Sequence, residues 1–155
     1  MRELKGFWKL ILNLLVGVWG IFILYTALLY ALHPLLQGGI SLSIGLAIVF
    51  LVYPFSKRML KWNVPKIFKY LFTGTNNAPS LLDLIFIAIS LIPCIYIMIH
   101  WEDVVRNPGV FETYHLVLAV LLIISLLEGT RRALGLTIPI LVSFFILYTI
   151  LGPHI

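Results

Sequence analysis

Long apolar runs separated by short polar stretches dominate the pattern of this chain. The runs cover about residues 10–32, 38–54, 81–100, 112–127 and 133–151. A transmembrane helix needs roughly 20 apolar residues, a length that the runs approach, the fourth being the shortest. The pattern therefore predicts an all-α integral membrane protein with about five transmembrane helices in one membrane domain, residues 1–155.

Two of the predicted spans carry residues that affect helix packing. Ser41 and Gly45 lie four apart in the second span, and such small pairs let another helix approach closely, although a pair this common can also be mere filler. Pro93 lies in the middle of the third span, where it predicts a kink in the helix.

Basic and apolar residues alternate between the second and third runs, in residues 56–79. The apolar ones recur at helical spacing while the lysines fall elsewhere, which predicts a cytoplasmic amphipathic helix on the membrane surface. The segment would bind anionic lipid headgroups, and it could also grip a partner subunit. The residues expected to anchor the chain at the interface are Trp8, Lys57, Arg58, Lys61, Trp62, Lys66 and Lys69.

The last two apolar runs are separated by a charged stretch, which contains Glu128, Arg131 and Arg132. These residues either turn the chain at the membrane surface or lie within the membrane. Burying two arginines costs several kcal/mol, so a cytoplasmic turn is the preferred interpretation. The alternative, four spans with residues 114–151 as one helix, would give a helix longer than the bilayer is thick.

The three charged residues of this stretch invite two hypotheses about their role. They could serve only to orient the chain in the membrane. Alternatively, Arg131 and Arg132 could dock onto carbonyl or carboxylate groups of a larger subunit.

Composition supports the membrane class: 61% of residues are hydrophobic and 11% charged, against about 25% charged in soluble domains. The net charge of +5 would raise the question of nucleic acid in a soluble protein. Here the basic residues flank apolar runs, so membrane lipids and not nucleic acid are the expected partners. All Lys and Arg except Arg106 fall on one side in the five-span topology. The amino terminus is therefore predicted to be cytoplasmic and the carboxyl terminus external.

Asp83 is the acidic residue closest to the start of the third span. Ser80, three positions earlier, can cap the helix, with Asp83 as the second half of a capping box. A role for Asp83 in binding a coupling ion or a proton is the alternative.

The four histidines lie at segment ends, all on the outer side in this topology. A haem or quinone site would need histidines on facing helices with polar partners, so interfacial histidines are expected instead. The sequence has no phosphate-binding loop, nucleophile elbow or tight metal-ligand spacing, and no internal repeat typical of a carrier. It predicts neither an enzyme nor a cofactor, but a helper of a larger membrane protein. The histidines are His33, His100, His115 and His154.

The charged stretch also carries a family resemblance. The run LEGTRRALGLTIPI (residues 127–140), followed by FILY (145–148) and GP (152–153), resembles the amino-terminal membrane region of fused TRAP transporter permeases. These are tripartite ATP-independent periplasmic transporters, and the branch that uses TAXI-type solute-binding proteins is the most similar. The rest of the chain resembles this region more loosely.

The resemblance implies a small, Q-type membrane subunit of a multi-pass bacterial or archaeal inner-membrane transporter. Its partners would be the large permease subunit, which carries substrate and sodium, and a periplasmic solute-binding protein. The chain would support sodium-driven uptake of organic acids without binding solute or sodium itself. The chain would be a separate subunit or part of a fused permease. A small membrane anchor or cofactor-binding subunit of a redox complex is the alternative function.

Overall fold

The computed structural model describes residues 4–55, 78–109 and 112–152, which form five α-helices and no β-strand. The helices are α1 (Phe7–Leu28), α2 (Pro34–Val52), α4 (Leu81–Arg106), α5 (Thr113–Leu134) and α6 (Thr137–Leu151). The predicted all-α class is confirmed. The amphipathic helix expected within residues 56–79 lies outside the described residues, apart from Ala78 and Pro79.

Four helices, α1, α2, α4 and α5, are long and apolar enough to cross a membrane, as expected of a multi-pass membrane protein. The last helix, α6, has 15 residues. At 1.5 Å per residue it is about 22 Å long, less than the roughly 30 Å of a bilayer core. The fifth span therefore stays a prediction.

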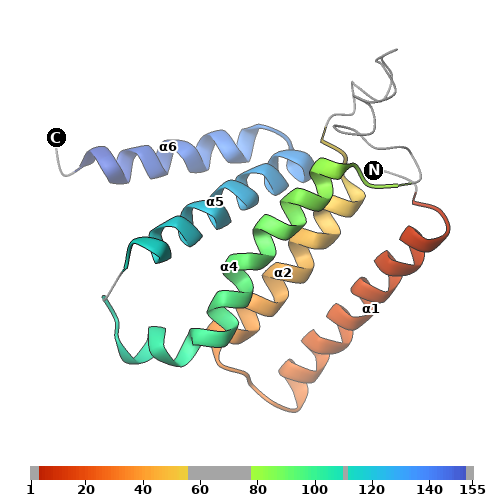
Figure 1. Cartoon of the computed structure of the whole chain (residues 1–155), viewed down its shortest axis with the longest axis horizontal. Helices are drawn as coiled ribbons and strands as arrows, with labels where there is room; N and C mark the ends of the chain where they lie inside the picture. Colours follow the sequence, from red (N-terminus) through yellow and green to blue (C-terminus); the bar gives the residue numbers. More distant parts are fainter. Residues whose placement is uncertain (1–3, 56–77, 110–111, 153–155) are drawn as a thin grey trace.

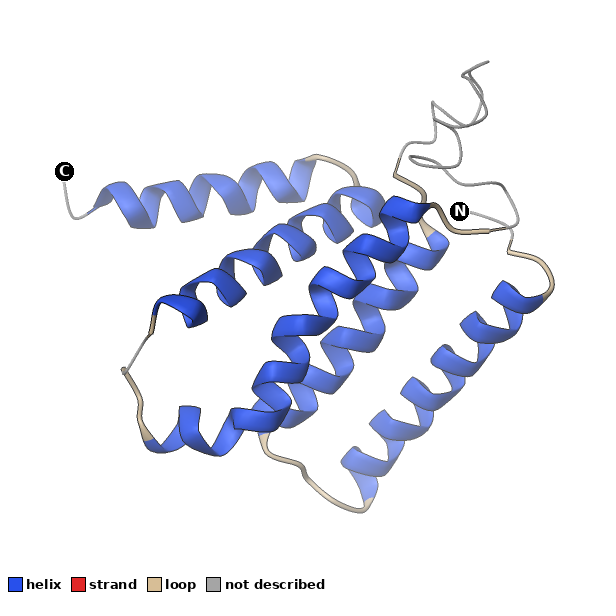
Figure 2. Cartoon of the chain, in the orientation of Figure 1, coloured by secondary structure: helices blue, strands red, loops and turns tan. Residues whose placement is uncertain are grey.

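The four long helices run in alternating directions and lie side by side (Figures 1 and 2). The start of α1, the end of α2, the start of α4 and the end of α5 lie at one end of the bundle, which we call the charged end. The connections from α1 to α2 and from α4 to α5 lie at the opposite end. Helix α6 turns back from α5 along the outside of the bundle.

Helix α2 is the centre of the bundle, because it contacts α1, α4 and α5. Among the described residues, α1 packs only against α2, and α6 only against α5. The outer faces of α1 and α6 consequently expose large apolar side chains. This is the distribution that lipid, as opposed to water, tolerates on a protein surface.

Small residues bring α2 and α4 together. The buried residues Gly39, Ser43 and Ala47 are spaced by four, so they share one face of α2. A Cβ atom added to Gly39 would lie 3.2 Å from Cγ of Met98 on α4, which shows how closely the two helices approach. The pair of small residues predicted for this span, Ser41 and Gly45, is two positions away from the packed face.

Of the two interpretations of this pair, close helix packing is therefore wrong for Gly45 in the described part of the bundle, and the alternative, mere filler, agrees with the structure. A Cβ atom at Gly45 would meet no atom within 4 Å, so no helix approaches closely there. The sequence offered two staggered sets of small residues on α2. Only the packing of the neighbouring helices decides which set is used.

Hydroxyl groups within the bundle are satisfied by their own helices. Ser43 donates to the carbonyl oxygen of Ile40 at 2.8 Å, and Ser90 to that of Ile87 at 2.9 Å. Ser125 on α5 donates in the same way to its own helix. Small hydroxyl residues can thus occupy an apolar interior without leaving an unpaired donor.

Several helices begin or end at other residues than the predicted runs do. Helix α1 ends at Leu28, four residues before the predicted end of its span, and His33 caps α2 by accepting a hydrogen bond from the amide of Leu35 at 3.3 Å. Helix α4 continues to Arg106. Its departure from helical dihedral angles falls at His100 (φ −105°, ψ 18°) and not at Pro93, where we expected the kink.

The charged stretch does not turn the chain, which is the main correction to the predicted topology. Glu128, Arg131 and Arg132 belong to α5, and the chain turns at Gly135, whose φ of 92° is unfavourable for other residues. The fourth span is therefore longer than predicted, and α6 starts at Thr137. The same turn excludes one continuous helix over residues 114–151.

Candidate functional site

The charged end of the bundle holds a cluster of four ionised side chains, which we call the charged cluster: Asp83, Glu128, Arg131 and Arg132. Residues 128, 131 and 132 are spaced by three and four, so they share one face of α5. Asp83 lies in the first turn of α4. Two carboxylates and two guanidinium groups balance, so the cluster has no net formal charge.

Arg132 is the centre of the charged cluster, and its side chain has no exposed surface. Its Nη1 donates to Oδ1 of Asp83 at 2.5 Å, and its Nε donates to Oε1 of Glu128 at 2.7 Å. The side chain of Asp83 is likewise fully buried. A single arginine thus connects the start of α4 to the end of α5.

Three phenylalanine rings enclose the guanidinium group of Arg132. Its Cζ atom lies 4.9, 5.3 and 5.2 Å from the ring centroids of Phe50, Phe55 and Phe86. Its Nη2 is buried without a hydrogen-bond partner in the described structure. The aromatic faces give a physical reason, because they attract cations and accept N–H groups weakly.

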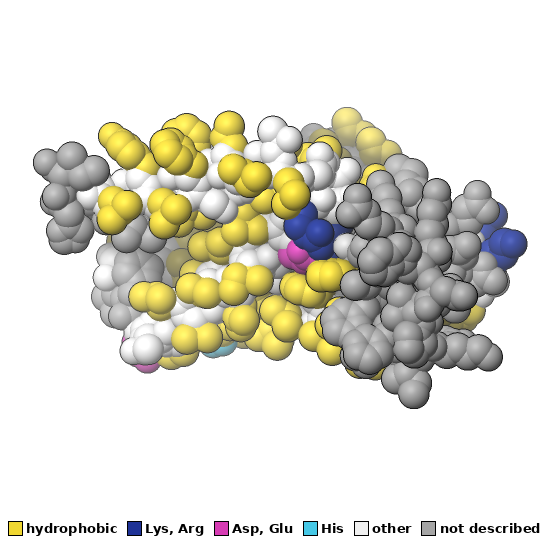
Figure 3. Space-filling view, turned by 90° about the horizontal axis from the view of Figure 1, so that it is seen from above, with side chains coloured by type: hydrophobic (Ala, Val, Ile, Leu, Met, Phe, Trp, Pro, Cys, Tyr) yellow, Lys and Arg dark blue, Asp and Glu magenta, His cyan; other side chains and the backbone are white. Residues whose placement is uncertain are grey.

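Arg131 is the more exposed arginine, with 32% of its side chain accessible, against 13% for Glu128. Its Nε and Nη2 donate to the two carboxylate oxygens of Glu128, each at 2.7 Å. This two-point contact is the preferred geometry between guanidinium and carboxylate. In Figure 3 basic and acidic side chains lie together among hydrophobic side chains of the described helices.

Both arginines also hold the chain that leaves α2. Nη1 of Arg132 donates to the carbonyl oxygen of Tyr53, and Nη2 of Arg131 to that of Phe55, each at 3.3 Å. Both carbonyl groups lie just beyond α2, where the helix offers them no partner, so these donors satisfy them. The cluster therefore fixes the end of α2 as well as α4 and α5.

Asp83 closes the capping box that the sequence predicts. Its backbone amide donates to Oγ of Ser80 at 3.1 Å, and its Oδ2 accepts from the Ser80 amide at 2.8 Å. The other carboxylate oxygen binds Arg132. The capping role of Asp83 is confirmed. The ion pair with Arg132 is a second role, which the sequence analysis did not predict. The role in binding a coupling ion or a proton stays a prediction.

Gly129 lets α5 approach α2 beside the cluster. A Cβ atom there would lie 3.1 Å from Cδ2 of Leu46 and 3.8 Å from Cζ of Phe50. Leu46 and Phe50 are both buried core residues of α2. The short motif around Gly129 therefore combines a close helix contact with the ion pairs on either side of it.

Sequence reasoning missed the partnership between Asp83 and Arg132, although a signal was present. The predicted topology put the start of the third span and the charged stretch on the same side of the membrane. Opposite charges at the same depth of a bundle tend to pair. What the sequence could not supply was that α4 and α5 are neighbours and that both contact α2.

The opposite end of the bundle carries aromatic and histidine side chains. Nδ1 of His115 accepts from the Glu112 amide at 3.0 Å, so the neutral ring has its proton on Nε2, which donates to the Tyr96 hydroxyl at 2.8 Å. That hydroxyl donates to Tyr114 at 3.2 Å. These contacts join α4 to the start of α5.

The remaining histidines have separate structural contacts. The ring of His33 lies 4.8 Å from that of Trp101, centroid to centroid, and His100 stacks on Tyr96 at 4.4 Å. His154 lies outside the described residues. Within the described ranges, no group of three His, Cys, Asp or Glu side chains could hold a metal ion.

The predicted interfacial anchors are divided between described and undescribed parts of the chain. Trp8 lies in the first turn of α1, partly buried, with its ring 6.0 Å from that of Phe7. The other six lie outside the described residues: Lys57, Arg58, Lys61, Trp62, Lys66 and Lys69.

The function of this site has to be inferred from its geometry and from the sequence. Comparisons of the chain with protein-family models, with curated proteins and with solved structures give no match. The charged cluster ties three helices together at one end of an apolar bundle.

Proposed function

We propose that the chain is the small membrane subunit of a TRAP-type transporter, or the corresponding region of a fused permease. In this proposal it scaffolds a large permease subunit for sodium-driven uptake of organic acids. A periplasmic solute-binding protein delivers the substrate. The chain itself binds neither solute nor sodium.

The observation that carries the proposal is the place of the motif that resembles these permeases. Within the most specific part of that resemblance, Gly129, Arg131 and Arg132 make contacts that join α5 to neighbouring parts of the chain. Glu128, in the same motif, accepts hydrogen bonds from both arginines. A motif used for internal assembly is what a scaffold requires. These contacts support the proposal, because they give the residues of the motif a structural role.

The polarity of the bundle favours a scaffold over a carrier. A carrier needs polar groups near the membrane midplane that are available to its solute. The buried serines of α2, α4 and α5 are instead bonded within their own helices, and the buried charges are paired. The exposed apolar faces of α1 and α6 are the surfaces available to lipid or to a large subunit.

We further propose that α6 is a fifth span in the inner membrane, with a cytoplasmic amino terminus. Lys5, Lys9 and the charged cluster lie at one end of the bundle, where α1 starts and α5 ends. Arg106 lies at the other end, in the last turn of α4, where it pairs with Glu102. This asymmetry favours a cytoplasmic charged end. Arg131, which is partly exposed, is then the arginine of the cluster that could contact a partner, since Arg132 is enclosed.

Uptake in cells tests the proposal. Cells that keep the large permease subunit and the binding protein, but lack residues 1–155, should lose solute uptake. Restoring the chain should restore uptake, and the chain should co-purify with the large subunit. Unchanged uptake with normal assembly of the large subunit would contradict the proposal. A stoichiometric Soret band in the purified protein would support the redox-complex alternative instead.

A further inference from the structure

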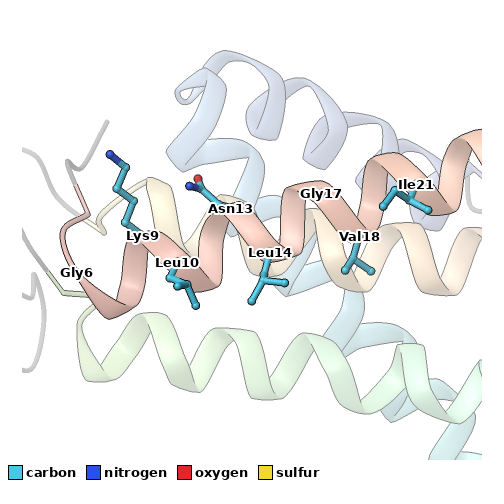
Figure 4. Close-up of a pocket in the computed structure, with 8 residues that line it drawn as sticks. All are labelled: Gly6, Lys9, Leu10, Asn13, Leu14, Gly17, Val18 and Ile21. Atoms are coloured by element: carbon cyan, nitrogen blue, oxygen red, sulfur yellow. The ribbon is translucent and has the colours of Figure 1, made fainter.

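A shallow groove runs along one face of α1 from its amino-terminal end (Figure 4). Within the described ranges, only residues of α1 and Gly6 just before it line this groove. Lys9 and Asn13 lie on one side of the groove, and Leu10, Leu14 and Val18 lie on the other. The groove therefore has a polar part close to the start of α1.

The two sides of the groove are rows of residues spaced by four along the helix. Gly17 continues the row of Lys9 and Asn13, and its missing side chain leaves a gap in that row. A Cβ atom at Gly17 would meet nothing within 4 Å. The packing of the described helices thus does not require glycine here, unlike at Gly39 and Gly129.

Polarity changes along the groove in one direction. At 1.5 Å per residue, Asn13 lies about 9 Å and Ile21 about 21 Å from the start of α1. Lys9 and Asn13 are therefore near the headgroup level, while the groove beyond Gly17 is wholly apolar and lies at the depth of acyl chains. A phospholipid has the same sequence of charge followed by hydrocarbon.

The polar groups of the groove lack partners inside the bundle. In the described part of the chain, neither Lys9 nor Asn13 makes a side-chain hydrogen bond or an ion pair. A primary amide at the edge of the hydrocarbon region loses hydrogen bonds to water unless another acceptor is supplied. Phosphate oxygens accept hydrogen bonds from both an ammonium group and an amide.

We propose that this groove binds an anionic phospholipid. Its phosphate lies between Lys9 and Asn13, and one acyl chain follows the apolar row past Gly17. A neighbouring protein helix would fit the apolar part, but it would also have to supply an anionic group beside Lys9. The inference concerns this chain alone and holds whether or not the chain serves a TRAP transporter.

Native mass spectrometry of the full chain in detergent tests the lipid site. Phosphatidylglycerol and phosphatidylcholine are titrated separately onto delipidated protein. Loss of the direct contact between one lysine and the lipid phosphate should weaken binding of the anionic lipid about fivefold. Lys9→Gln should show this loss, and Gly17→Leu, which fills the gap, should weaken binding to a similar extent.

Two matched variants separate the groove from its surroundings. Lys5→Gln removes the same charge from the same end, and Gly20→Leu adds the same side chain to α1 outside the groove. Both should change binding less than twofold, and circular dichroism should show that all four variants keep their helix content.

Three results would overturn the proposal. The first is equal binding of the two lipids by the unaltered chain. The second is unchanged phosphatidylglycerol binding by folded Lys9→Gln and Gly17→Leu. The third is spontaneous disulfide pairing of a Gly17→Cys variant between two copies that phosphatidylglycerol does not suppress, which would assign the groove to a second copy.

Discussion

Arg132 illustrates how a full charge can be stable inside an apolar bundle. Its Nε and Nη1 meet carboxylates from two helices, Nη1 also meets a backbone carbonyl, and aromatic rings cover the remaining surface. Burying a charge is costly, and its partners offset the cost only when the geometry is good. Removing one partner therefore lowers the free energy of unfolding by more than the intact pair adds to it.

We expect Arg132→Gln to destabilise the bundle by about 3–5 kcal/mol, because it takes the arginine away from the buried carboxylate of Asp83 and one of two arginines away from Glu128. The measurement is the midpoint of denaturant unfolding in detergent micelles. Asp83→Asn combined with Arg132→Gln should cost less than the sum of the two single changes, since the two changes together remove both charges of one ion pair.

Arg106→Gln is the matched control for this substitution. Arg106 also forms an ion pair, with Glu102 of the same helix, but the two side chains are 75% and 56% exposed. Exposed pairs contribute about 0–1 kcal/mol, so the unfolding midpoint should hardly move. Equal effects of the two substitutions would contradict the assignment of Arg132 as the buried centre of the cluster.

The ends of the helices are set by short-range contacts that hydrophobic periodicity does not reveal. The capping box of Ser80 and Asp83 starts α4, and a box formed by Glu112 and His115 starts α5. Gly135 ends α5 in a conformation with φ 92° and ψ −170°. That region is essentially confined to glycine, so this residue lets α6 fold back.

Gly135→Ala should therefore lower stability by about 1–3 kcal/mol, the typical cost of forcing a side chain into this region. Unfolding in detergent micelles measures the loss. Gly152→Ala provides the control, because Gly152 has ordinary helical dihedrals (φ −53°, ψ −39°) and open space around it. If Gly135→Ala left the stability unchanged, the turn between α5 and α6 would not need glycine.

The molecule as a whole is a bundle with unlike ends, one with paired charges and basic flanks and one with histidines and tyrosines. The proposed orientation places the charged end in the cytoplasm. Residues exposed at the two ends should then react with membrane-impermeant thiol reagents from opposite sides.

Cysteine labelling in a Cys94→Ala background checks this orientation. Lys5→Cys and Leu136→Cys should react only after the cytoplasmic side is made accessible, and Asn107→Cys should react in intact cells. Leu136 is 61% exposed and lies directly after the turn that ends α5. Labelling of Leu136→Cys and Asn107→Cys from the same side would refute the alternating arrangement of α4 and α5.

Much of this architecture follows from the sequence. The apolar runs predicted helices long enough to cross a membrane, and Ser80 and Asp83 predicted a capping box. The interpretation of the charged stretch as the turn itself was wrong, because these residues belong to α5 and the chain turns at Gly135. Arg132 is buried there beside the carboxylate of Asp83, about 50 residues earlier in the sequence.

The sequence by itself determined the class of the protein, since the hydrophobic effect and the bilayer thickness act on composition and run length alone. Only the tertiary structure decided which small residues of α2 pack and where the last turn lies, and it also revealed the pairing of Asp83 with Arg132. These outcomes depend on which helices are neighbours and how they are rotated. A charge inside a membrane bundle is tolerated or excluded according to the partner that packing places beside it.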